Sequence, residues 1–186
     1  AAWLDYDHDY DVDLMLFGER SVLFRNNGEA GFSDQSGDFP FAADLALSAQ
    51  IIEVLPDTNG RDVFVTYANR TGILYKDMLA GAFEARDVDQ APAGSRAMAV
   101  ADLDADSATD VILGSGPTVT VLLNRFGRFE PVVIGGSADA VAVVDFDNRA
   151  LLDIVTGGSV QLPHDIELVV AGEDDRLLGD RLPRNL

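Results

Sequence analysis

The apolar residues of this chain fall in short runs separated by Gly, Asp and Asn, a pattern typical of β-strands and turns. Runs rich in Val and Ile lie at 62–67, 110–114 and 153–157, and residues 139–147 alternate small and larger apolar side chains. In another apolar segment, Asn27-Gly28 suits the positive φ of a tight hairpin turn. No stretch of about 11 residues combines helical caps with helical periodicity, so the pattern predicts an all-β chain.

One pattern recurs along the chain, an acidic stretch followed by an apolar run. It reads LDYDHDYDVDLMLFG at 4–18, ADLDADSATDVILGS at 101–115, VDFDNRALLDIVTGG at 144–158 and, in a shorter copy, VLPDTNGRDVFVTYA at 54–68. A second apolar run follows each copy. Repeats of about 40–50 residues, each with about four short strands, are typical of β-propeller blades. We therefore predict one β-propeller region over 1–186, with approximate units 1–46, 47–95, 96–138 and 139–186.

Four blade-like units leave the assembly open. We expect them to form part of a larger ring, for example a seven-bladed one, because the chain starts at Ala1 without Met or a leader and reads as a processed or excised piece. Closure as a four-bladed ring and assembly with other chains are the alternatives. A blade buries its faces only against neighbours, so the remaining blades of the same or another chain are expected partners.

The net charge of the chain limits which classes of molecule it can bind. The 186 residues include 32 acidic and 13 basic side chains, for a formal net charge of −19. This charge repels nucleic acid and anionic membrane surfaces and favours cations. No apolar run approaches the roughly 18 residues that span a bilayer. The chain has no cysteine, so its sequence does not indicate whether its compartment is oxidising or reducing.

The acidic stretches place carboxylates at alternate positions. The first has Asp at positions 1, 3, 5 and 9, and the copy at 101–115 repeats the spacing; these residues are Asp5, Asp7, Asp9, Asp13, Asp102, Asp104, Asp106 and Asp110. Carboxylates at that spacing can converge on one centre, and several hard oxygen ligands suit Ca²⁺ better than Mg²⁺. Solvated acidic turns are the competing interpretation. An EF-hand is excluded, because Leu16 and Leu113 stand where it needs a Glu.

The other two copies are incomplete. Weaker metal candidates are Asp145, Asp147 and Asp153 in one, and Asp57, Asn59 and Asp62 in the other. Arg149 replaces the position-5 aspartate in the first of these and supplies positive charge of its own. We expect two calcium sites, and up to four if the incomplete loops also bind.

Together these segments resemble a known repeat. DYDHDYDVDLMLFG followed by LFRNNGEAGFSD is similar to the FG-GAP/VCBS repeat, the calcium-binding blade of integrin-α-type β-propellers, although Tyr10 and Ser107 replace the loop glycine. The resemblance covers nearly the whole chain and is closest in the first and third units. It implies that the four aspartates of each complete loop bind calcium together with the backbone carbonyls of Asp11 and Ala108, and that the ion rigidifies the blade.

The resemblance also implies a setting and a role. Relatives are mostly extracellular, so we expect an extracellular, cell-surface or periplasmic protein whose export signal is not in this stretch. The expected function is a non-catalytic module that binds or scaffolds protein or carbohydrate ligands. The alternative is the propeller portion of a calcium-dependent polysaccharide lyase or hydrolase. No cluster of candidate acid, base or nucleophile groups stands outside the loops, which favours the non-catalytic role.

Overall fold

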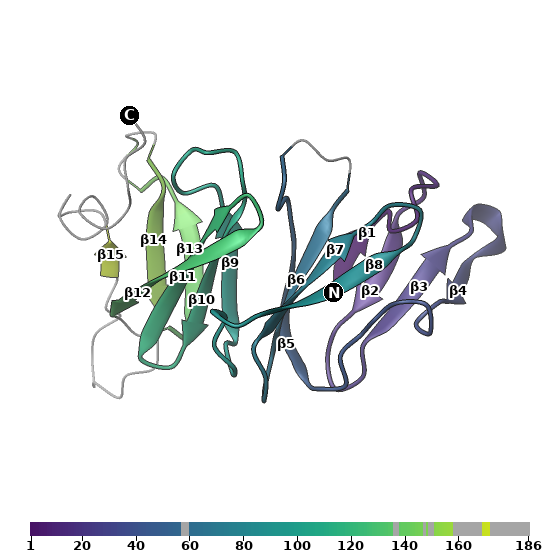
Figure 1. Ribbon diagram of the computed structural model, residues 1–186, viewed down its shortest axis with the longest axis horizontal. Helices are drawn as coiled ribbons and strands as arrows, with labels where there is room; N and C mark the ends of the chain where they lie inside the picture. Colours follow the sequence, from purple (N-terminus) through teal and green to yellow (C-terminus); the bar gives the residue numbers. More distant parts are fainter. Residues whose placement is uncertain (57–59, 136–137, 147, 149–150, 158–168, 172–186) are drawn as a thin grey trace. The chain divides into compact units, whose positions relative to one another are not determined.

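The computed structural model describes residues 1–56, 60–135, 138–146, 148, 151–157 and 169–171, and it confirms an all-β chain (Figure 1). The chain divides into two compact units, Ala1–Gly94 and Ser95–Leu186, which are described separately. Every sheet is an antiparallel meander in which consecutive strands are neighbours. Within the described residues, one short 3-10 turn at Gly28–Ala30 is the only helical element, and no helix could cross a membrane.

The first unit contains two four-stranded sheets. The strands of one are β1 (Ala2–Leu4), β2 (Asp13–Leu16), β3 (Val22–Asn26) and β4 (Phe32–Asp34). Those of the other are β5 (Ala46–Ile52), β6 (Asp62–Tyr67), β7 (Gly72–Asp77) and β8 (Phe83–Val88). The hairpin expected at Asn27-Gly28 joins β3 to β4 and contains the 3-10 turn.

The second unit repeats this arrangement. Its four-stranded sheet consists of β9 (Ala97–Ala101), β10 (Asp110–Ser115), β11 (Thr118–Arg125) and β12 (Arg128–Gly135). A further sheet has three strands in the described part of the chain, β13 (Ala140–Val144), β14 (Asp153–Gly157) and β15 (Val169–Ala171). The four acidic stretches of the sequence therefore each precede the second strand of a separate sheet, so the predicted repetition is confirmed as repeated sheets.

Apolar side chains at alternate positions along the strands form the core of each unit. In the first unit, Met15 and Leu23 lie on one face of the β1–β4 sheet and join a buried cluster with Val63, Val65 and Tyr75 of the β5–β8 sheet. In the second unit, Ile112 and Val121 of the β9–β12 sheet join Ile154 of β14 in the same way. Since side chains on a strand alternate between faces, each sheet contributes one row of apolar residues to such a cluster.

The opposite face of the β1–β4 sheet is also apolar but is open. Trp3, Leu14 and Phe24 are cross-strand neighbours on this face, and Leu16 pairs with Val22 beside them. Trp3 remains 57% exposed, whereas Val63 and Tyr75, in the corresponding rows of the β5–β8 sheet, are fully buried. This second face of the sheet is therefore apolar, and Trp3 and Leu16 remain exposed on it.

Candidate metal centres

The first acidic loop joins β1 to β2. Hydrogen bonds from its backbone N–H groups to its own aspartates hold it in its conformation. Asp5 accepts hydrogen bonds from the backbone N–H groups of Asp9 (3.1 Å) and Tyr10 (3.0 Å), and Asp9 accepts one from Asp11 (3.0 Å). His8 and Tyr10 adopt φ of 63° and 74°, the left-handed region that favours glycine. The hydrogen bonds to Asp5 offset the cost of this conformation, so Tyr10 can occupy the position where the resemblance expects glycine.

The loop between β9 and β10 has the same geometry. Asp102 accepts hydrogen bonds from the N–H groups of Asp106 (3.1 Å) and Ser107 (2.9 Å), and Asp106 accepts one from Ala108 (2.9 Å). The φ angles of Ala105 and Ser107 are 60° and 71°. Two loops that share neither their intervening residues nor a glycine thus fold identically around the aspartates.

The aspartates of each loop converge. In the first loop, Asp5, Asp7 and Asp13 each place a carboxylate oxygen within 4.8 Å of the others, and Asp102, Asp104 and Asp106 do so in the third unit. Either triad could hold a metal ion. These six residues were all named from the sequence spacing, but the triads occupy positions 1, 3 and 9 in the first loop and positions 1, 3 and 5 in the third unit. Asp9 and Asp110, which the spacing also named, belong to neither triad.

One buried carboxylate oxygen in each triad has no hydrogen-bond donor within the described part of the chain. Oδ1 of Asp7 and Oδ1 of Asp104, both at position 3 of their loops, are buried and accept no hydrogen bond from the described residues. The Asp104 side chain is 7% exposed. A buried carboxylate oxygen without a donor is costly, and a cation bound by the triad would satisfy it. The donor set, three carboxylates in a loop of strained but well-bonded backbone, fits a hard divalent cation.

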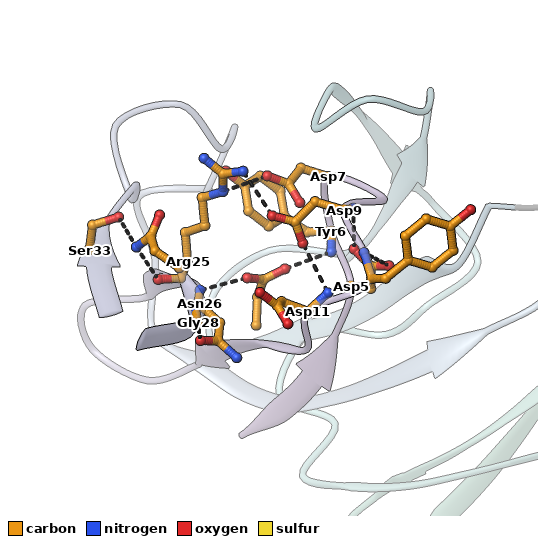
Figure 2. A network of polar contacts seen from close by, with 12 residues as sticks. Asp5, Tyr6, Asp7, Asp9, Asp11, Arg25, Asn26, Gly28 and Ser33 are labelled. Atoms are coloured by element: carbon orange, nitrogen blue, oxygen red, sulfur yellow. Dashed lines mark hydrogen bonds and ion pairs between the residues drawn. The ribbon is translucent and has the colours of Figure 1, made fainter. Parts of the chain in front are cut away.

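An arginine contacts one or more carboxylates of each triad. In the first loop, the Nε atom of Arg25 is 2.6 Å from Oδ2 of Asp7, and its Nη2 atom is 2.8 Å from Oδ2 of Asp9 (Figure 2). In the third unit, Arg125 forms ion pairs with Asp104 and Asp106. The sequence spacing did not predict these contacts, because each arginine comes from the third strand of its sheet.

The position-9 aspartates have a structural role that the spacing of the acidic stretches did not predict. Asp13 accepts hydrogen bonds from the N–H groups of Tyr6 (2.9 Å) and Asn26 (2.8 Å), and Asp110 accepts equivalent bonds from Leu103 and Asn124 (both 2.8 Å). Each of these fully buried carboxylates therefore joins the start of its acidic loop to the end of the third strand.

Asp62 makes both of these bonds in its incomplete unit, and Asp153 makes at least the first. Asp62 accepts from Val54 (3.3 Å) and Asp77 (2.8 Å), and Asp153 accepts from Phe146 (3.0 Å). The position-9 aspartate thus serves the fold of every unit, whether or not the rest of the acidic loop is complete. The persistence of this one aspartate in the incomplete copies was the sequence feature that could have revealed its role.

Burial dominates the titration of these aspartates. It raises the pKa of Asp110 to about 6, and it also raises the pKa values of Asp13 and Asp62, although the backbone hydrogen bonds act in the opposite direction. The neighbouring carboxylates Asp104 and Asp106 add a smaller upward contribution at Asp110. The fold therefore keeps these carboxylates buried despite the cost of removing their charge from water.

The remaining candidates are less well placed. Asp57, Asn59 and Asp147 lie outside the described residues, as does Arg149. Asp145 lies immediately after β13 and, like Asp62 and Asp153, belongs to neither triad.

His8, between two aspartates of the first loop, contacts a different carboxylate. Its Nε2 atom is 2.9 Å from Oδ2 of Asp77 on β7. Asp77 also accepts hydrogen bonds from the N–H groups of Arg61 and Leu79. The His8 ring therefore links the first loop to the neighbouring sheet of its unit.

Comparison with known proteins adds no family assignment. No model of a known protein family matches the chain, and no curated protein matches it. The chain is accordingly characterised by its own structure, as an all-β protein of repeated antiparallel sheets that carries two clusters of aspartates able to hold metal ions.

Proposed function

We propose that this chain is a calcium-stabilised β-propeller module of the FG-GAP/VCBS type. Its role is non-catalytic binding or scaffolding of protein or carbohydrate ligands outside the cell, at the cell surface or in the periplasm. Support comes from the repeated four-stranded meanders, the net charge of −19 and the two aspartate triads, each in a loop between the first and second strands of a sheet.

The observation that carries the proposal is the pair of unpartnered oxygens. The same atom, Oδ1 of the position-3 aspartate, is buried without a hydrogen-bond donor in both loops. One such atom in isolation has many explanations, but two at equivalent positions indicate a common requirement of the loop. Asp5, Asp7 and Asp13 would hold one ion and Asp102, Asp104 and Asp106 the other. Bound calcium supplies positive charge and joins residues of one loop that otherwise repel one another.

Calcium is favoured over magnesium by the type of ligand. Each triad offers several carboxylate oxygens on a curled loop, and backbone carbonyls, including those of Asp11 and Ala108, are available in the same loops. Calcium accepts six to eight oxygens in a flexible geometry, whereas magnesium requires a near-ideal octahedron and retains waters. The role of the ion in this proposal is to rigidify the blade.

The open face of the β1–β4 sheet supports the expected partners. Trp3 and Leu16 are exposed on the face that corresponds to the buried face of Val63 and Tyr75 in the β5–β8 sheet. Exposed apolar surface of this kind is characteristic of a binding interface. We propose that the remaining blades of a propeller, in the same or another chain, cover this face, and that the ligand binds elsewhere on the ring.

Substitution of one triad residue tests the metal assignment. Asp104→Ala is expected to reduce the calcium stoichiometry from two ions per chain to one in isothermal titration calorimetry, because it removes the unpartnered oxygen of the second triad only. Asp87→Ala is the matched control, since Asp87 pairs with Arg70 outside both triads. Two ions bound by the Asp104→Ala chain would contradict the assignment.

A further inference from the structure

We propose that Arg25 and Arg125 are built-in cations that compete electrostatically with calcium, lowering its affinity and holding the acidic loops together where calcium is scarce. This inference rests on the proposed calcium sites and concerns their regulation. It follows from the fact that both complete loops, which carry an excess of negative charge, have a guanidinium in direct contact with the metal-ligand candidates.

The two arginines contact equivalent carboxylate oxygens through different nitrogen atoms, Nε and Nη2 of Arg25 and Nη1 of Arg125. Arg25 lies against Oδ2 of Asp7 and Oδ2 of Asp9, and Arg125 lies against Oδ2 of Asp104 and Oδ2 of Asp106. In both loops the arginine therefore spans positions 3 and 5. In both loops it also leaves Oδ1 of the position-3 aspartate without a partner.

The two arginines reach this position from different places in the sequence. Asn26 and Asn124 are structurally equivalent, because each donates its backbone N–H to the position-9 aspartate of its unit at 2.8 Å. Arg25 precedes the first asparagine, whereas Arg125 follows the second. A guanidinium thus reaches the same two carboxylates from non-equivalent positions. The two units therefore share a positive charge beside the acidic loop, although the arginine occupies a different position on the third strand.

The arginines act on loops that are crowded with like charge. Carboxylates held this close repel one another, and a positive charge among them lowers that repulsion whether or not a metal is bound. The pairs involving Arg125 are poorly exposed, with side-chain exposures of 18% for the arginine and 7% for Asp104, so solvent screens them incompletely.

The same charge opposes a divalent cation bound by those carboxylates. A cation held by Asp104 lies next to a guanidinium that contacts the same side chain, and the two positive charges repel. We expect each arginine to weaken calcium binding at its loop by roughly tenfold, which places the sites in the weaker range typical of extracellular calcium modules.

Removal of the charge at Arg125 tests the inference. In calorimetric titrations with CaCl₂ at low ionic strength, Arg125→Gln is expected to bind calcium about tenfold more tightly at one of two sites, and this gain should shrink at high salt. Arg125→Lys keeps the charge and should retain the wild-type affinity. Arg70→Gln, which breaks an arginine–aspartate pair away from the triads, should also leave calcium binding unchanged. With EDTA present, Arg125→Gln should unfold at a lower temperature than the wild-type chain.

The outcomes separate this inference from the proposed function. If the wild-type chain binds two ions and Arg125→Gln binds them with equal or lower affinity, the competition is overturned and the calcium sites stand. If only Arg125→Gln binds calcium, the competition holds and the proposed function of the wild-type chain fails. If neither chain binds calcium, both proposals are overturned. A merely structural arginine would lower the melting temperature on substitution but would not raise the affinity.

Discussion

Replacement of Asp110 by alanine is expected to lower the free energy of unfolding by about 2–5 kcal/mol, the largest effect of any single substitution considered for this chain. Its carboxylate is fully buried and accepts the N–H groups of Leu103 and Asn124, so its loss leaves two buried donors without their acceptor. Each such donor costs about 1–3 kcal/mol. The loss should be measurable as a lower midpoint of urea denaturation.

The conditions of that measurement distinguish the structural role from metal binding. The effect of Asp110→Ala should persist in EDTA, because the hydrogen bonds involve no ion. Asp110→Asn keeps one acceptor oxygen and should give a smaller loss, while Asp87→Ala, on the exposed β8 strand, should have little effect. A loss below about 1 kcal/mol, or one that disappears in EDTA, would contradict this structural role of Asp110.

Chelation of calcium should produce the second large effect. With two sites and calcium about 20-fold above the dissociation constant, mass action stabilises the folded chain by roughly 3.5 kcal/mol. For a chain of this size that corresponds to a fall of roughly 10 °C in melting temperature when EDTA replaces calcium. The scan should be repeated with magnesium, which should restore little of the lost stability because it fits the loops less well.

The Asp104→Ala chain provides the control for this scan. Because it retains one calcium site, the fall in its melting temperature on chelation should be about half that of the wild-type chain. An equal melting temperature with and without calcium in the wild-type chain would mean that the ion does not stabilise the fold.

The strands were predictable because their sequences carry a local pattern. The Val- and Ile-rich runs at 62–67, 110–114 and 153–157 became β6 (Asp62–Tyr67), β10 (Asp110–Ser115) and β14 (Asp153–Gly157). Each run begins at an aspartate, and the chain alternates between faces from there. Six of the eight aspartates predicted as ligands form the two triads, because aspartates close together in the sequence need no long-range contact to meet.

What the sequence could not show depends on contacts between distant strands. Arg25 and Arg125 reach the acidic loops from 16 to 21 residues away, and the spacing of the aspartates carries no information about them. The same holds for the bond from Asn124 to Asp110, 14 residues apart. The turn at Tyr10 was also difficult to predict, because a side chain with positive φ is disfavoured until Asp5 binds its N–H group.

The arginines change how the clustered charge is understood. From the sequence, five aspartates within 5–13 required either an external cation or extensive solvation. In the structure, the guanidinium of Arg25 contacts Asp7 and Asp9, and burial removes part of the cluster from solvent altogether. The loop therefore combines an internal positive charge with one buried carboxylate oxygen that still lacks a partner.

The most direct test of the account is the amount of metal that the protein retains. The chain should be equilibrated by dialysis against buffer containing millimolar calcium and magnesium, and the bound ions should be counted by elemental analysis against the dialysate. Two bound calcium ions per chain and no bound magnesium are expected. Absence of bound calcium, or an equal content of both metals, would contradict it.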